Sequence, residues 1–172
     1  YVVRISRQLD LADVTPSGGA PNRQCSSRVI SDGIDGGLSS MMFLGCAGRS
    51  GLEQAELARS TTCVSGYSME TDTEHVLNSI REKTMAHAGP IYLSLDADVL
   101  DRRHLNTSPR RRAGQVSLTH LIELLRALRG AEIIGAHLSG FIPGLATTQW
   151  DATECAVVIA EEMASLMQGE TV

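Results

Sequence analysis

Aromatic residues are scarce in this sequence of 172 residues, which holds only two Phe, three Tyr and one Trp. The hydrophobic core must therefore consist of Leu, Ile, Val, Ala and Met side chains. No apolar run approaches the roughly 18 residues that span a bilayer, and the opening segment YVVRIS lacks the long apolar stretch of a signal peptide. We expect no membrane partner, and we interpret this opening, which has no initiator Met, as the middle of a longer chain.

Motifs for thiolate metal sites and for phosphate binding are also missing. The four Cys residues show no CxxC spacing, and the glycine-rich segments fit neither GxxxxGKS/T nor GxGxxG. Cysteines spread in this way are typical of reduced thiols, so we expect a cytoplasmic protein. The net charge of −5 argues against nucleic acid as a partner. One basic cluster is the exception and fits a solvated loop or an anion site: Arg102, Arg103, Arg110, Arg111 and Arg112.

Short β-branched runs alternate with helix-like segments, which is the pattern of a parallel sheet with crossover helices. Strands are expected at residues 2–5, 41–46, 62–65, 91–96 and 132–136. Helices are expected at residues 26–31, 52–59 and 118–128, and after capping boxes at 71–74 and 151–154. Most of residues 13–40 is expected to be loop. The alternation predicts one α/β domain over residues 1–172.

The most informative segment is SLDADVLD, residues 94–101, which closes the most hydrophobic expected strand. In an extended strand, the side chains of Asp96 and Asp98 point to the same face. They would lie at the C-terminal edge of the sheet, where parallel α/β proteins place their ligands. Two adjacent carboxylates favour a hard divalent cation. The alternative is that these residues only cap the turn that follows the strand.

The order of several motifs resembles the ureohydrolase family, which includes arginase, agmatinase and formimidoylglutamase. SLDADVLD matches the family's SxDxDxxD string, and VSLTHLIELLRAL, EIIGAHL, a Pro-containing loop and a final helix follow in the family's order. Upstream, ISRQLDL stands where the family has FDAHLDL. The resemblance spans essentially all 172 residues. It implies a three-layer α/β/α, arginase-like fold with a mainly parallel sheet, of which this chain is the C-terminal part without the N-terminal portion.

The same resemblance implies a pair of Mn2+ ions that activate a bridging water. Matched residue by residue, Asp96 would bridge the metals, Asp98 would complete one metal site and Asp10 the other. The family's other bridging Asp is replaced by Ser6, and a His ligand is replaced by Gln8. The remaining His ligand would lie before Tyr1. A neutral hydroxyl and a carboxamide cannot replace the charge of a carboxylate or the donor strength of an imidazole.

The substrate-binding position is also degenerate, because the family's Glu in its ExNP segment aligns with Gly140. The resemblance implies manganese-dependent hydrolysis of a C–N bond in a guanidino or formimino compound, impaired here, and we assign no catalytic residue. The alternative is an inactive pseudoenzyme that serves as a binding or oligomer-assembly subunit. In either case a homo-oligomer, trimeric or hexameric, is expected.

Overall fold

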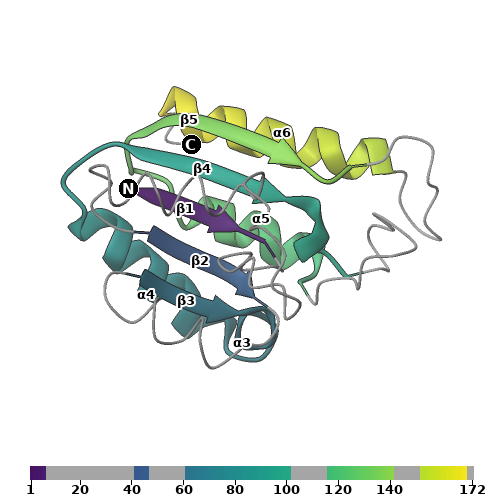
Figure 1. The fold of residues 1–172 in the computed structure, drawn as a ribbon, viewed down its shortest axis with the longest axis horizontal. Coiled ribbons are helices and arrows are strands. Elements are labelled where there is room, and N and C mark those ends of the chain that lie inside the picture. Colours follow the sequence, from purple (N-terminus) through teal and green to yellow (C-terminus); the bar gives the residue numbers. More distant parts are fainter. Residues whose placement is uncertain (7–40, 47–60, 102–115, 142–151, 170–172) are drawn as a thin grey trace, which may run out of the picture.

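The computed structural model describes residues 1–6, 41–46, 61–101, 116–141 and 152–169. Within these residues the strands form a five-stranded sheet in the order β3-β2-β1-β4-β5 (Figure 1). The strands are β1 (Val2–Ile5), β2 (Met41–Cys46), β3 (Thr61–Ser65), β4 (Ile91–Asp96) and β5 (Ile133–Ser139). Every neighbouring pair is parallel, so the prediction of a mainly parallel sheet is confirmed.

In the part of the chain that the structure describes, four α-helices and one short 3-10 helix accompany the sheet. They are α3 (Gly66–Thr71), α4 (Thr73–Ala86), η1 (Ala97–Val99), α5 (Leu118–Arg126) and α6 (Ala152–Gln168). In Figure 1, α4 and α5 lie behind the sheet, and α6 runs along its β5 edge. Helix α6 also packs against α5, where Glu162 binds both Arg126 (3.1 Å) and Arg129 (2.7 Å).

The core fills the space between the sheet and the helices. Alternate strand residues such as Val3 and Ile5 belong to it, whereas Val2, buried on the opposite face of the same strand, does not. Helix α5 contributes Leu121, Leu124 and Leu125, spaced so that they share one face. As the scarcity of aromatics predicts, the buried core cluster of the described residues is built from aliphatic side chains, Met and one Cys.

Several boundaries differ from the sequence prediction: β3 begins at Thr61 instead of residue 62, and α5 ends at Arg126 instead of residue 128. The capping box expected at Thr71 is wrong, because Thr71 ends α3 and the cap position of α4 is Asp72, whose side chain makes no capping hydrogen bond. Helix α3 itself was missed: it is short, begins at a glycine, and is capped by Ser65, whose Oγ accepts from Ser68 N at 3.0 Å. Strand β5 continues beyond residue 136 to Ser139.

The other expected elements agree with the structure or fall outside the described residues. Ser117 caps α5 as predicted, its Oγ accepting from His120 N at 3.2 Å. The helices expected at residues 26–31 and 52–59, and the cap at Asp151, lie outside the described residues. Among the residues that are described, no helix is both long and apolar enough to cross a membrane.

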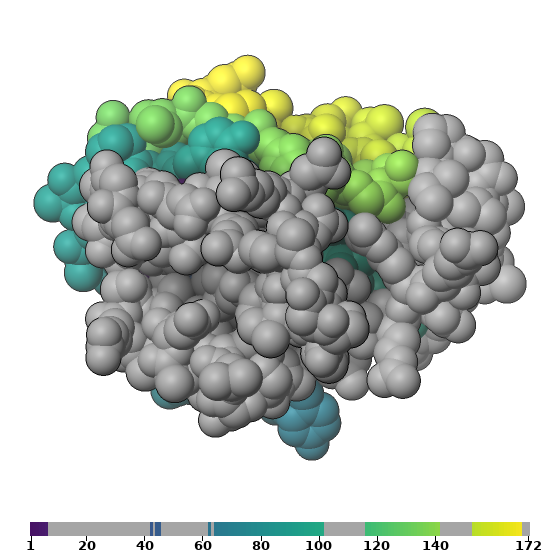
Figure 2. Space-filling view, viewed as in Figure 1, coloured from purple at the N-terminus to yellow at the C-terminus, as the bar shows by residue number. Residues whose placement is uncertain are grey.

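The space-filling view shows β5 and α6 forming a continuous surface along one edge of the molecule (Figure 2).

Candidate functional site

The order of the strands creates a switch point at the centre of the sheet. From β1 the chain proceeds outward through β2 to β3, whereas β4 lies on the other side of β1 and leads to β5. In open parallel sheets, ligands bind outside the carboxyl ends of the two strands where the order reverses. Here those strands are β1 and β4, and all arrowheads point to the same edge (Figure 1). Ser6 follows β1 directly and Asp96 is the last residue of β4.

Asp96 and Asp98 both lie at this point, but not as neighbours on one extended strand. Strand β4 ends at Asp96, and Asp98 sits in the η1 turn, so the expectation that a strand presents both on one face is wrong. The Asp96 carboxylate caps η1, with Oδ1 accepting from Asp98 N at 3.1 Å. The capping role offered as the alternative from sequence is thus present for Asp96.

Ser6 and Asp98 are joined across the switch point. Ser6 Oγ donates a hydrogen bond to Asp98 Oδ1 at 3.2 Å, and the two residues are each only 2% exposed. Burying a carboxylate is costly unless it accepts hydrogen bonds, and this hydroxyl supplies one. The pairing β1–β4 brings these residues together although 92 positions separate them in the sequence.

Gly140 closes the site from the end of β5. Its φ of +84° lies in the left-handed region that favours glycine. A Cβ atom at this position would overlap Asp96 Oδ1 and lie 3.1 Å from Ala97 N. The absence of a side chain at Gly140 is therefore what allows Asp96 to adopt its capping position.

The structure thus brings together four of the six sequence-predicted site residues, namely Ser6, Asp96, Asp98 and Gly140. Asp10 and Gln8 lie outside the described residues, as do the five arginines of the basic cluster. Within the described ranges, no group of three or more His, Cys, Asp or Glu side chains is arranged to hold a metal ion.

Sequence reasoning missed a polar row beside the site. Ser94 Oγ and His137 Nδ1 lie 3.2 Å apart across the β4–β5 pair, where the two residues are register partners. Arg4 occupies the same register position on β1 and is 4% exposed. His137 is exposed on β5, the edge strand of the described sheet. Only the strand order, which the sequence does not give, could have revealed this row.

A five-stranded parallel sheet of this order, with carboxylates at its switch point, defines an α/β protein of the arginase-like class. The sequence matches the arginase family over residues 9–166, and the chain belongs to that family, the ureohydrolases. Comparison with the sequences of curated proteins gives no significant match.

Solved structures of this family share the fold. Proclavaminate amidino hydrolase from Streptomyces clavuligerus aligns with a TM-score of 0.76 and 20% identity, covering 98% of this chain and 56% of that one. A hypothetical agmatinase from Burkholderia thailandensis gives 0.73 and 16%, covering 97% and 50%. An arginase-like protein from T. brucei, a triple mutant bound with Mn2+, gives 0.64 and 16%, covering 96% and 52%. The chain thus spans about half the length of these proteins.

Proposed function

We propose that this chain is a non-catalytic member of the arginase family, whose two-metal centre has been replaced by a hydrogen-bonded site and which serves as a binding or assembly subunit. The observation that carries the proposal is the buried hydrogen bond from Ser6 to Asp98. The resemblance to ureohydrolases implies a metal-bridging carboxylate at the position that Ser6 occupies in this chain.

The donor set does not fit a pair of Mn2+ ions. Hard divalent cations are held by several anionic oxygens, which offset their charge. In the described part of the site a neutral hydroxyl stands in for one carboxylate, and it occupies an oxygen of the second. The Asp96 carboxylate is meanwhile engaged by the Asp98 amide. Protein hydrogen bonds therefore engage one oxygen of each of the two carboxylates in the described part of the site.

A second candidate is residual hydrolase activity toward a guanidino or formimino compound, and the convergence of Asp96 and Asp98 favours it. Together with Asp10, these carboxylates would supply three of the ligands that the resemblance implies. Such a set can hold one divalent ion with water completing the shell. A bound metal would supply a hydroxide near neutral pH. Assembly into a homo-oligomer, a cytoplasmic location and a single domain over residues 1–172 remain predictions.

The solved T. brucei protein offers a direct experimental analogy. It has been studied as variants in which Ser residues are changed to Asp and an Arg to His, at positions that include three spaced two residues apart. Ser6, Gln8 and Asp10 have the same spacing in this chain. Changing Ser6 and Gln8 to Asp and His therefore reinstates the pattern that the family uses for metal.

Calorimetric titration with Mn2+ tests the proposal. We expect the Ser6→Asp/Gln8→His variant to bind Mn2+ more than about 100-fold more tightly than the natural chain, because residues that contact the metal outweigh the 10–100-fold effects of residues that only orient the ligands. The matched control is the same variant with Asp96→Ala and Asp98→Ala, which should lose the gain. Tight Mn2+ binding by the natural chain, with Mn2+-dependent release of urea or formamide from a guanidino or formimino compound, would instead establish the second candidate.

A further inference from the structure

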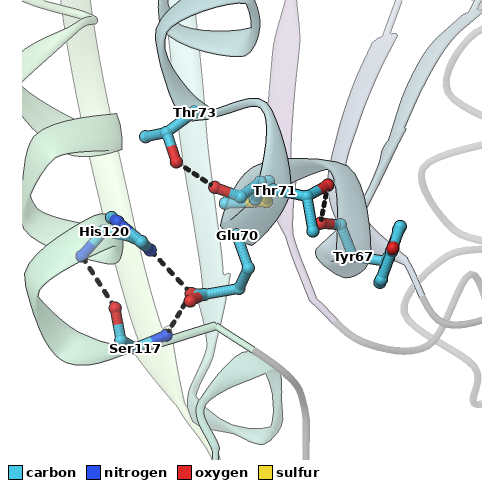
Figure 3. Close-up of polar contacts among 7 residues, drawn as sticks. Tyr67, Glu70, Thr71, Thr73, Ser117 and His120 are labelled. Atoms are coloured by element: carbon cyan, nitrogen blue, oxygen red, sulfur yellow. Dashed lines mark hydrogen bonds and ion pairs between the residues drawn. The ribbon is translucent and has the colours of Figure 1, made fainter.

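Glu70 links α3 to the start of α5 by two contacts from one carboxylate oxygen. Its Oε1 accepts from Ser117 N at 2.7 Å and lies 2.8 Å from His120 Nδ1 (Figure 3). Both the Glu70 and the His120 side chains are 29% exposed, so the contact is half-buried. Ser117 is the cap of α5, whose first N–H groups have no partner within the helix. A carboxylate at this position also suits the positive end of the helix dipole.

The residue before this cap is tied to the turn that carries Asp98. Val116 N donates to Val99 O at 3.2 Å, and Asp101 N donates to Val116 O at 2.9 Å. These bonds form an isolated parallel bridge between Val116 and Leu100. Val99, Leu100 and Val116 are all at most 1% exposed, so the bridge is shielded from water. Any displacement of Ser117 is therefore transmitted to the end of η1.

We propose that Glu70 is a positioning residue for the Asp96–Asp98 site: it anchors the start of α5, and through the Val116 bridge it fixes the η1 turn that carries Asp98. This inference rests on the proposed position of the functional site, but not on whether that site holds a metal. It adds to the site a side chain from α3, an element that contains none of the ureohydrolase motifs.

The ionisation of Glu70 supports this role. Burial raises the pKa of the Glu70 carboxyl, but the Ser117 N–H and the His120 side chain outweigh that effect and leave its pKa below the ordinary value. A carboxyl with a lowered folded-state pKa contributes stability that is fully present above its unfolded value and is lost as pH falls through the folded value. Other ionisable groups on the packed elements are Asp72, Glu74 and His75 at the start of α4 and Glu123 on α5; His120 is the one that contacts the carboxylate.

Amide hydrogen exchange read by NMR tests the proposal on the full chain. In Glu70→Ala the protection of the Val116 and Asp101 amides should fall about 10-fold, which corresponds to the loss of one hydrogen bond to a charged group. Glu70→Gln keeps the shape and removes the charge, so it should show a smaller loss. The matched control is Glu162→Gln, which weakens the contacts of a carboxylate only 10% exposed with Arg126 and Arg129 and should leave both amides unchanged.

A pH series separates positioning from a merely structural contact. In the natural chain, protection of the two amides should fall as the pH drops through the titration of Glu70, whereas in Glu70→Gln it should stay flat. Unchanged protection in Glu70→Ala, or equal losses in the Glu162→Gln control, would overturn the proposal.

Metal affinity gives an independent readout. In the Ser6→Asp/Gln8→His background, adding Glu70→Gln should weaken Mn2+ binding about 10-fold, the lower end of the range for residues that orient ligands without touching the metal. Failure of that background to bind Mn2+ at all would count against the proposed function. The exchange experiment would still decide the role of Glu70.

Discussion

The Ser6→Asp variant is expected to lose about 3–5 kcal/mol of unfolding free energy when no divalent metal is present, the cost of an uncompensated buried charge. Ser6 is 2% exposed, and its Oγ is a hydrogen-bond donor to Asp98. A carboxylate in its place has no proton to donate at neutral pH and lies beside another carboxylate. Urea denaturation at pH 7 in the presence of a chelator measures the loss.

A neutral side chain of the same size as Asp at position 6 separates the effect of the added charge from the effect of the added volume. Ser6→Asn retains an N–H donor for Asp98 and should cost clearly less than Ser6→Asp. Addition of Mn2+ should restore stability to Ser6→Asp/Gln8→His but not to Ser6→Asn, because only the former supplies ligands that bind the folded state. If Ser6→Asp is as stable as the natural chain in the presence of chelator, the hydrogen bond from Ser6 to Asp98 does not stabilise the metal-free site as proposed.

The second large effect is expected at Gly140, where Gly140→Ala should destabilise the fold by about 2–5 kcal/mol through left-handed backbone strain and overpacking together. Gly140 has φ +84°, and its Cβ would overlap the Asp96 carboxylate. Thermal and urea unfolding give the size of the loss.

Gly130→Ala provides a matched control at a second left-handed glycine. Gly130 has φ +88°, but its Cβ would meet only Met85 Sδ at 3.7 Å, an ordinary contact. It should therefore show the backbone part alone, about 1–2 kcal/mol. Equal losses at the two glycines would contradict the packing of Gly140 against Asp96. A larger loss in Gly140→Ala than in Gly130→Ala would mean that the family's Glu cannot be reinstated at position 140 without moving Asp96.

Much of the fold could be predicted from local patterns. The run Tyr92, Leu93 and Leu95 predicts strand β4 correctly, although Tyr92 is exposed and the strand is not buried on both faces. The leucines of α5 repeat at helical spacing behind a serine cap. Helix α3 was not predicted, because its six residues begin with glycine and are too few to show a helical repeat of apolar side chains. The limits of β5 were missed because His137 and Ser139 continue the strand with polar residues.

Local sequence patterns predict only part of the candidate site. Asp96 and Asp98 are recognisable because they share one short motif. The hydrogen bond between Ser6 and Asp98 depends on β1 lying beside β4, which no local pattern encodes. The role of Glu70 was hidden for the same reason, since it is separated from Ser117 by 47 positions and acts through an element that was not predicted.

The central place of β1 has a consequence for how the protein folds. Its partner β4 is distant in the sequence, because the register of the two strands pairs Val2 with Tyr92 and Ile5 with Leu95. Closing long loops costs entropy before any contact repays it, so topologies rich in distant pairings fold slowly. We therefore expect the pairing of β1 with β4, and with it the hydrogen bond between Ser6 and Asp98, to be among the slower contacts to form.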